Sequence, residues 1–286
     1  MTLASYARNV YSQLGEDGLL EEMLNRIGAG HLTGWCVEFG AWDGVHLSNT
    51  CNLIRSRGYR AVLIEGDPKR AAQIPTNLPG DSVIVLNTFV QFEGADTLDN
   101  LLSSTAIPKR FDVLSIDIDG ADYWILESLQ RYQPLILVIE YNSLIPNAVH
   151  FAQERSTTIS QGSSARAIVE LASERGYVLA AATETNLLLV TEDFAAAVLD
   201  PEVLALALSG DSGAVLSLLR PDHPVYVFPL FDGTVCTSER VSLHWQGTRM
   251  PSTELHRLPK PFRSSAHEWG RWRRRAWRVY RRLLLR

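Results

Sequence analysis

Short apolar runs, separated by turn residues and helical segments, fill the first 140 residues of the chain. They are Trp35–Phe39, Arg60–Ile64, Ser82–Leu86, Phe111–Ile116 and Leu135–Ile139. Continuous apolar runs of this length are typical of parallel strands that are buried on both faces. Between them, apolar residues recur at helical spacing, as at Leu98, Leu101 and Leu102. The alternation predicts an α/β fold with a largely parallel sheet.

The end of this region has a different pattern. Ser163–Gly176 predicts a helix, and the apolar runs Tyr177–Ala182 and Leu187–Val190 then flank the turn Thr183–Asn186. Two such runs around a short polar turn predict an antiparallel hairpin. We therefore expect a three-layer α/β sandwich with a Rossmann-like sheet of seven strands, mostly parallel, whose last hairpin is antiparallel.

Candidate chemistry begins at the turn after the first strand. Gly40 and Gly44 permit positive φ and close approach of a ligand, while Glu38 and Glu65 place acids near the ends of the first two strands. Ligands of open α/β sheets bind beyond the carboxyl ends of the strands, and an acid that ends the second strand can accept ribose hydroxyls. The turn lacks the glycine fingerprint of dinucleotide-binding proteins. An acid inside the turn favours a ligand with an ammonium group, which predicts S-adenosylmethionine (SAM) rather than NAD.

Five phrases in order carry a family resemblance: Tyr11–Asp17 (YSQLGED), Val37–Gly44 (VEFGAWDG), Ser48–Thr50 (SNT), Ile64–Pro68 (IEGDP) and Leu114–Gly120 (LSIDIDG). With them, residues 8–191 resemble the FkbM-type SAM-dependent methyltransferases. The resemblance implies the class I methyltransferase sheet and methyl transfer, commonly to oxygen, on sugars, glycans or polyketide-like natural products. The implied cofactor-binding residues are Gln13, Glu38, Gly40, Ala41, Gly44, Asn49, Glu65, Asn87 and Asp117.

The carboxylates at Asp117, Asp119 and Asp122 follow the fourth strand and allow two interpretations. In one, Asp117 binds the SAM ammonium group and Asp119 is a general base. In the other, Asp117 and Asp119 hold a divalent ion of the magnesium type, which prefers carboxylate oxygens. Asp122 also suits a simple helix cap.

Further catalytic candidates are Glu140, at the end of the fifth strand, and His46, in the first turn. A hydroxyl acceptor requires a base or a metal to remove its proton, so Asp119, Glu140 and His46 are the candidates in that order. A long segment from Ile145 to about Ser163 predicts a lid over the acceptor site.

Charge divides the chain into an acidic body and a basic end. The last 16 residues hold eight arginines and no acid, so the net charge of −5 becomes −13 over residues 1–270. The basic end predicts an amphipathic helix that binds an anionic membrane surface or an acidic partner; nucleic acid is not expected. We expect a methyltransferase domain at residues 1–194, a small appendage at 195–262 and this tail at 263–286.

Several features that the sequence lacks bear on the cellular location of the protein. It has no apolar run long enough to span a membrane and no signal-peptide pattern at its start, and Cys36, Cys51 and Cys236 are scattered. These features predict a cytoplasmic protein, with the tail allowing peripheral contact at the inner membrane surface. A non-catalytic SAM-fold scaffold in glycan assembly and an NAD-dependent sugar oxidoreductase are the alternative functions.

Overall fold

The computed structural model describes residues 2–118, residues 120–221, five short strands between residues 227 and 257, and residues 269–284. The chain divides into two compact units, Met1–Asp222 and His223–Arg286. The first unit contains the sheet and the candidate site. Each unit is described by itself below.

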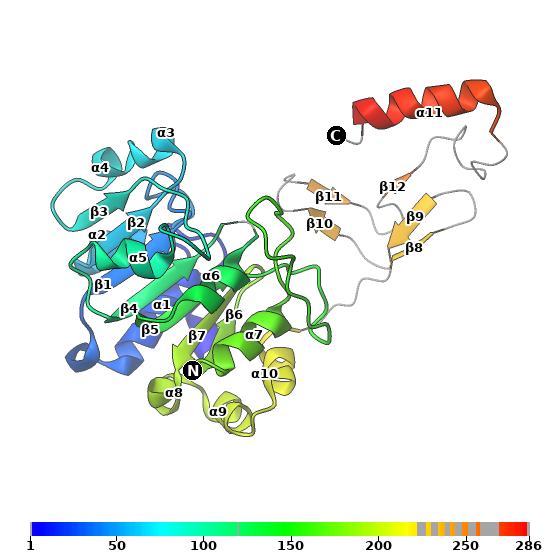
Figure 1. Cartoon of the computed structure of the whole chain (residues 1–286). Helices are drawn as coiled ribbons and strands as arrows, with labels where there is room; N and C mark the ends of the chain where they lie inside the picture. Colours follow the sequence, from blue (N-terminus) through cyan, green and yellow to red (C-terminus); the bar gives the residue numbers. More distant parts are fainter. Residues whose placement is uncertain are drawn as a thin grey trace. The chain divides into compact units, whose positions relative to one another are not determined.

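The first unit is built on the predicted seven-stranded sheet, whose strand order is β3-β2-β1-β4-β5-β7-β6 (Figure 1). The strands are β1 (Trp35–Phe39), β2 (Arg60–Ile64), β3 (Val83–Leu86), β4 (Arg110–Ile116), β5 (Gln133–Glu140), β6 (Tyr177–Ala182) and β7 (Asn186–Thr191). The first five are mutually parallel, whereas β7 is antiparallel to both β5 and β6. The predicted fold class is therefore confirmed.

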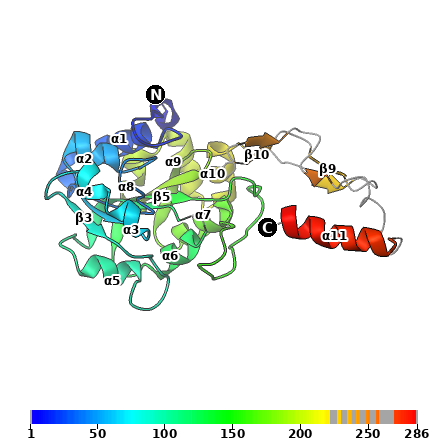
Figure 2. The ribbon, with the colours of Figure 1, turned by 90° about the horizontal axis from the view of Figure 1, so that it is seen from above.

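Helices cover both faces of the sheet (Figures 1 and 2). They are η1 (Leu3–Tyr6), α1 (Glu16–Ile27), η2 (Ala29–His31), α2 (Cys51–Arg57), α3 (Pro68–Ala71), α4 (Ile74–Asn77), α5 (Leu98–Ser103), α6 (Asp122–Ser128), α7 (Ala165–Ser173), α8 (Glu192–Val198), α9 (Pro201–Leu208) and α10 (Ser212–Leu219). The strands β1, β2, β4 and β5 are almost wholly buried between the two helical layers. This burial explains why they read as continuous apolar runs rather than as alternating ones.

The region after the sheet differs from the predicted arrangement. The apolar, alanine-rich sequence Val203–Leu219 predicts helix, and the structure divides this stretch into α9 and α10, separated where Gly210 adopts φ +74°. Asp211 then caps α10 by accepting the N–H of Ala214 at 2.9 Å. Because α9 and α10 contact β6 and α10 also contacts α7, residues 195–221 lie in the first unit and not in the predicted appendage.

The second unit contains two small sheets and one helix. β8 (Val227–Pro229), β9 (Thr234–Thr237) and β12 (His256–Arg257) form one sheet, and β10 (Val241–Leu243) pairs with β11 (Thr248–Met250) in the other. The dipeptide Asp232-Gly233 between short apolar runs predicts a hairpin, and the antiparallel pairing of β8 with β9 confirms it for the strands. Asp232 and Gly233 themselves lie outside the described residues. The predicted basic helix is α11 (Arg271–Leu284). None of the helices described for this chain combines the length and apolarity that crossing a bilayer requires.

Candidate cofactor and acceptor site

The turn after β1 is shaped by close packing against the end of β4. Gly40 has φ +74°, and a Cβ atom placed on it would lie 1.8 Å from the carbonyl oxygen of Asp117. The two strand ends therefore meet at a separation that only glycine permits. Gly44 also has positive φ, at +81°, and is packed against Ile74 and Leu78.

A carboxylate joins this turn to the end of β2. Glu65 is 6% exposed, and its carboxylate accepts the N–H groups of Trp42 at 2.8 Å and of Asp67 at 2.7 Å. The neighbouring Ala41 N–H donates to the carbonyl of Ile64 at 3.2 Å. The side chain of Asn87, after β3, donates to the carbonyl of Glu65 at 2.7 Å. The predicted residues Ala41, Glu65 and Asn87 thus lie together at one edge of the sheet.

Glu38 makes a second network at this edge. Its buried carboxylate accepts the hydroxyls of Ser48 and Thr50, both at 2.6 Å, and the N–H of Asn49 at 2.9 Å. The Asn49 side chain in turn donates to the Ser115 hydroxyl on β4 at 3.1 Å. Ser48 also caps α2 by accepting the N–H of Cys51 at 2.9 Å. Glu38 therefore holds the Ser48–Thr50 segment against β1.

The environment of Glu38 predicts a pH-dependent stability. Burial raises the pKa of the Glu38 carboxyl, although Ser48, Thr50 and Asn49 favour its charged form. For an acid whose pKa is raised on folding, the contribution to stability is complete below the unfolded pKa, about 4.3, and is lost as the pH rises through the folded pKa. A neutral glutamine has no such loss. The Tm of Glu38→Gln, relative to wild type, should therefore increase with pH across this window in thermal melts.

Asp67→Asn is the matched control for this experiment. Hydrogen bonds from the N–H groups of Lys69 and Arg70 lower the pKa of Asp67, so its contribution is complete above the unfolded pKa of about 3.9. The Tm difference between Asp67→Asn and wild type should stay constant above that pH. A Glu38→Gln difference that is constant or decreases with pH would show that the Glu38 carboxylate is not penalised by burial.

The acidic turn after β4 is only partly described. Asp117 is half-buried at the end of β4, and Asp119 lies outside the described residues. The carboxylate of Asp122 accepts the N–H groups of Ile118 at 3.0 Å and Gly120 at 2.9 Å. Asp122 therefore stabilises the turn itself, as the capping interpretation expects.

Glu140 lies at the end of β5, two strands from β1, which corresponds to roughly 10 Å across the sheet. It pairs in register with Asn186 of β7. The side chain of Asn186 donates to buried Glu16 at 3.1 Å, and Thr183 donates to the same oxygen at 2.8 Å. The start of α1 is thereby fixed beside the carboxyl end of β5, which the sequence pattern does not reveal.

The loop before α1 is organised by a buried aspartate. One carboxylate oxygen of Asp17 accepts the N–H groups of Val10, Tyr11 and Ser12 at 2.7 to 2.8 Å. The other oxygen is buried without a hydrogen-bond partner in the structure. Gln13, the residue predicted to contact the cofactor, is exposed within this loop.

The turn between Gly40 and Ser48 also has unusual backbone geometry. Trp42 and Leu47 adopt φ +50° and +55°, which is uncommon for residues other than glycine and concentrates at functional sites. The exposed ring of Trp42 lies under the guanidinium of Arg70 at 3.3 Å and beside His46, with ring centroids 5.5 Å apart. His46 is itself exposed, and its backbone N–H donates to Asp43.

The predicted lid is an ordered loop built around Gln153. This side chain is fully buried; its amide nitrogen donates to the carbonyls of Ser156 and Ile159, and its oxygen accepts the N–H groups of Gln161 and Gly162. One buried glutamine therefore satisfies four backbone groups and closes the loop on itself.

The lid lies against the acidic turn. A Cβ atom on Gly120 would be 2.5 Å from the carbonyl oxygen of Ile159 and 3.2 Å from the Cα of Ser160. At the base of the loop, Arg220 donates to the carbonyls of Ser143 at 2.6 Å and Ile145 at 3.4 Å. The lid is thus anchored at both ends beside the residues that follow β4 and β5.

Metal ligation finds no support in the described part of the chain, where no group of three or more His, Cys, Asp or Glu side chains is placed to hold an ion. The sequence predicts Asp117 and Asp119 as magnesium ligands, and Asp119 lies outside the described residues.

The class of protein follows from the sheet. Its strand order, with the antiparallel β7 between β5 and β6, is the α/β Rossmann-like arrangement of class I SAM-dependent methyltransferases. More narrowly, residues 94–179 match the family model described as "Methyltransferase FkbM domain". The resemblance given by the sequence phrases is therefore confirmed over that segment, which includes the Leu114–Gly120 phrase. No curated protein matches the chain.

Solved structures show a weak general likeness. An O-methyltransferase from Bacillus cereus in complex with SAH is 19% identical, covers 66% of this chain and 86% of its own, and has a TM-score of 0.40. An S-adenosylmethionine-dependent methyltransferase from Listeria monocytogenes, described as putative, is 9% identical, covers 62% and 97%, and has the same score. A SAM-dependent methyltransferase from Aquifex aeolicus is 11% identical, covers 62% and 89%, and scores 0.38. All three scores are below 0.5, and the strand order, not this likeness, defines the fold.

Proposed function

We propose that this protein transfers a methyl group from SAM to a hydroxyl of a sugar, glycan or related natural product. The observation that carries the proposal is the Glu65 carboxylate, buried at the end of β2 and hydrogen-bonded to Trp42 in the turn that Gly40 forms. A carboxylate has about four acceptor positions, and two are used by Trp42 and Asp67. The remaining positions suit the two hydroxyls of a ribose.

The other residues of this edge supply the rest of a cofactor site. Gly40 permits close approach of the backbone, and the exposed side chain of Asn87 lies beside Glu65 at the end of β3. Asp117 and the Gln13 loop lie on the side of β4 and α1, where an ammonium group would meet carboxylate and amide oxygens. Glu38 supports this site by holding Asn49 in place. SAM, when bound, supplies an electrophilic methyl group on a sulfonium.

The chain's contribution to the reaction is positioning and proton removal. The lid and the ends of β4 and β5 hold the acceptor oxygen in line with the methyl group, which accounts for much of the rate gain in a two-reactant reaction. The carboxylate of Glu140 would take the hydroxyl proton as the carbon–oxygen bond forms and the methyl carbon–sulfur bond breaks, with S-adenosylhomocysteine as the leaving group. Asp119 is the alternative base.

Incubation with SAM that carries an isotope-labelled methyl group, together with a panel of sugars, glycans and polyketide alcohols, tests this proposal. The expected product is an acceptor that carries one labelled methyl group. Loss of this product in the Glu140→Gln variant would support Glu140 as the general base. Label recovered on nitrogen or carbon would refute the choice of a hydroxyl. Cofactor binding without product from any acceptor class would favour the scaffold function.

The basic helix α11 suggests that the protein binds its acceptor at a membrane surface. Its described side chains from Arg271 to Arg275 are exposed, and Trp272 is 84% exposed. Basic helices that expose tryptophan bind anionic membrane surfaces, with about 1 kcal/mol contributed by each arginine near the surface. We propose that α11 places the protein peripherally on such a surface.

Vesicle sedimentation measures this interaction. Reversing two charges in Arg273→Glu/Arg275→Glu should reduce binding to anionic vesicles by at least about tenfold, because roughly 1 kcal/mol is lost for each arginine removed. Arg57→Glu, an exposed change on α2, is the matched control and should bind as wild type does. Equal partitioning of all three proteins would exclude a membrane role for α11.

A further inference from the structure

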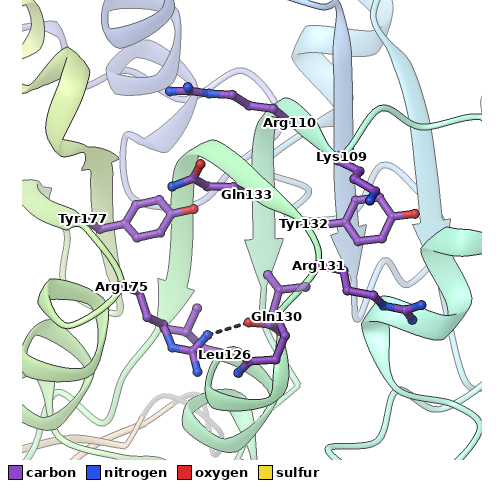
Figure 3. A pocket seen from close by; sticks show the side chains of 10 residues that line it. Lys109, Arg110, Leu126, Gln130, Arg131, Tyr132, Gln133, Arg175 and Tyr177 are labelled. Atoms are coloured by element: carbon purple, nitrogen blue, oxygen red, sulfur yellow. Dashed lines mark hydrogen bonds between the residues drawn. The ribbon is translucent and has the colours of Figure 1, made fainter.

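A second candidate site lies at the opposite edge of the sheet, where β4 and β5 begin. A cavity of about 460 Å³ is lined there by residues at the start of both strands, by the end of α6 and by the segment between α7 and β6 (Figure 3). Arg110 and Gln133 are the first residues of β4 and β5, and they are paired in register. The carboxyl ends of the same strands are six residues away, about 20 Å along β4. The cavity is therefore separate from the candidate methyl-transfer site.

The lining of this cavity is strongly basic. It contains four cationic side chains and no carboxylate: Lys109, Arg110, Arg131 and Arg175. This concentration contrasts with the net charge of −13 over residues 1–270. A pocket lined by charge of one sign attracts ligands of the opposite sign.

Two of the four cations make no ion pair with a carboxylate among the residues that the structure describes. Arg175 donates to the main-chain carbonyls of Glu127 and Leu129, which carry no net charge, and its Nε is buried without a partner. Lys109 makes no ion pair with any residue that the structure describes. Tyr132 lines the same cavity as Lys109, and both are labelled in Figure 3.

The other two cations have a carboxylate nearby, but their own side chains are about half exposed. Arg110 pairs with Asp193, and Arg131 lies 3.8 Å from Asp99, with the arginine side chains 47% and 48% exposed. The exposed Arg110–Asp193 pair contributes roughly 0 to 1 kcal/mol, so Arg110 can turn to a ligand at little cost. The Arg131–Asp99 contact is long, and the side chain of Arg131 donates to Asn100 at 2.7 Å, a neutral partner that a phosphate can replace. Arginine is well suited to phosphate because its guanidinium donates two parallel hydrogen bonds.

We propose that this pocket binds a small organic phosphate, with Lys109, Arg131 and Arg175 holding the phosphoryl group. The cavity volume lies within the roughly 300 to 1,000 Å³ of small-molecule sites, which leaves room for a sugar or a nucleoside beside the phosphate. The tyrosine ring of Tyr132 and the side chains of Leu126 and Leu129 offer apolar contact to that second part. The site is independent of the proposed methyl transfer.

Isothermal titration of the full chain with inorganic pyrophosphate tests the pocket directly. Saturable binding is expected for wild type, and Lys109→Ala/Arg131→Ala should bind at least about tenfold more weakly, since each lost charge-assisted hydrogen bond costs roughly 1.5 kcal/mol or more. Arg57→Ala removes an exposed arginine on α2, far along the sequence from the pocket, and should bind as wild type does. A Lys109→Ala single variant repeats the test if the double variant has a lowered Tm.

The second part of the ligand is identified by two further titrations. Uridine diphosphate binding more tightly than pyrophosphate assigns the pocket to nucleotides, whereas glucose 1-phosphate binding more tightly assigns it to sugar phosphates. In both cases the Lys109→Ala variant must bind the tighter ligand more weakly than wild type does. Absence of saturable binding by all three compounds, or equal binding by wild type and the pocket variants, overturns the proposal.

Discussion

Glu65→Ala should abolish most of the affinity for S-adenosylhomocysteine, with a Kd at least about 100-fold higher than that of wild type. The carboxylate is proposed to accept both ribose hydroxyls, and each hydrogen bond to a charged group is worth roughly 1.5 to 3 kcal/mol. Its loss also frees the N–H of Trp42 in the turn. Titration calorimetry on the purified variant measures the effect.

Two variants separate a binding role for Glu65 from a structural one. Glu65→Gln keeps one oxygen acceptor and should lose less affinity than Glu65→Ala. Asp81→Ala removes an exposed carboxylate before β3, at the amino edge of the sheet, and should bind as wild type does. An unchanged Kd for a folded Glu65→Ala protein would mean that the ribose is bound elsewhere.

Gly40→Ala is expected to be the most damaging small substitution in the chain. The new methyl group would lie 1.8 Å from the carbonyl oxygen of Asp117, and alanine is disfavoured at φ +74°. Since the obstacle is backbone, the ends of β1 and β4 must separate, which should cost about 2 to 4 kcal/mol of stability. A lower Tm in thermal melts and loss of S-adenosylhomocysteine binding are both expected.

Gly30→Ala is the matched control for this change. Gly30 has no atom within 4 Å of a built Cβ and has no positive φ, so alanine there should be neutral or slightly stabilising. If Gly40→Ala melts and binds as Gly30→Ala does, the close contact between β1 and β4 is not a feature of the folded protein.

The sheet was predictable because its strands are buried on both faces. Trp35–Phe39 and Arg60–Ile64 have the predicted bounds, and the final hairpin differs by one residue at each end of its second strand. Parallel strands between two helical layers must be apolar throughout, and this leaves a signal in the sequence. The long apolar stretch Val203–Leu219 is helical except at its break, which is hard to foresee because Gly210 and Asp211, which end one helix and begin the next, lie inside an apolar region.

The sequence pointed to the positions of the candidate site, whereas their hydrogen-bond partners came from the structure. Glu38 and Glu65 stood out because acids at the ends of apolar runs are unusual, yet the sequence does not show which groups they bind. The structure pairs Glu38 with Ser48, Asn49 and Thr50, and pairs Glu65 with Trp42. Such pairings depend on the geometry of turns, which the spacing of apolar residues along the sequence does not reveal.

Contacts between distant segments were the hardest to foresee. Glu16 meets Asn186 across 170 positions, and the basic pocket collects Lys109, Arg131 and Arg175 from three connections that look like ordinary charged loops in the sequence. These groups converge because the sheet order places β5 between β4 and β7. Only the topology brings such residues to one edge.

Titration of the wild-type protein with S-adenosylhomocysteine tests the central claim most directly. If the carboxyl edge of β1, β2 and β4 is a SAM site, one molecule should bind per chain with micromolar affinity, about 8 kcal/mol, and the binding should be lost in Glu65→Ala. The same titration with magnesium added separates cofactor binding from a metal requirement. Absence of binding by the folded protein, with and without magnesium, would contradict the assignment of this edge as a methyltransferase cofactor site.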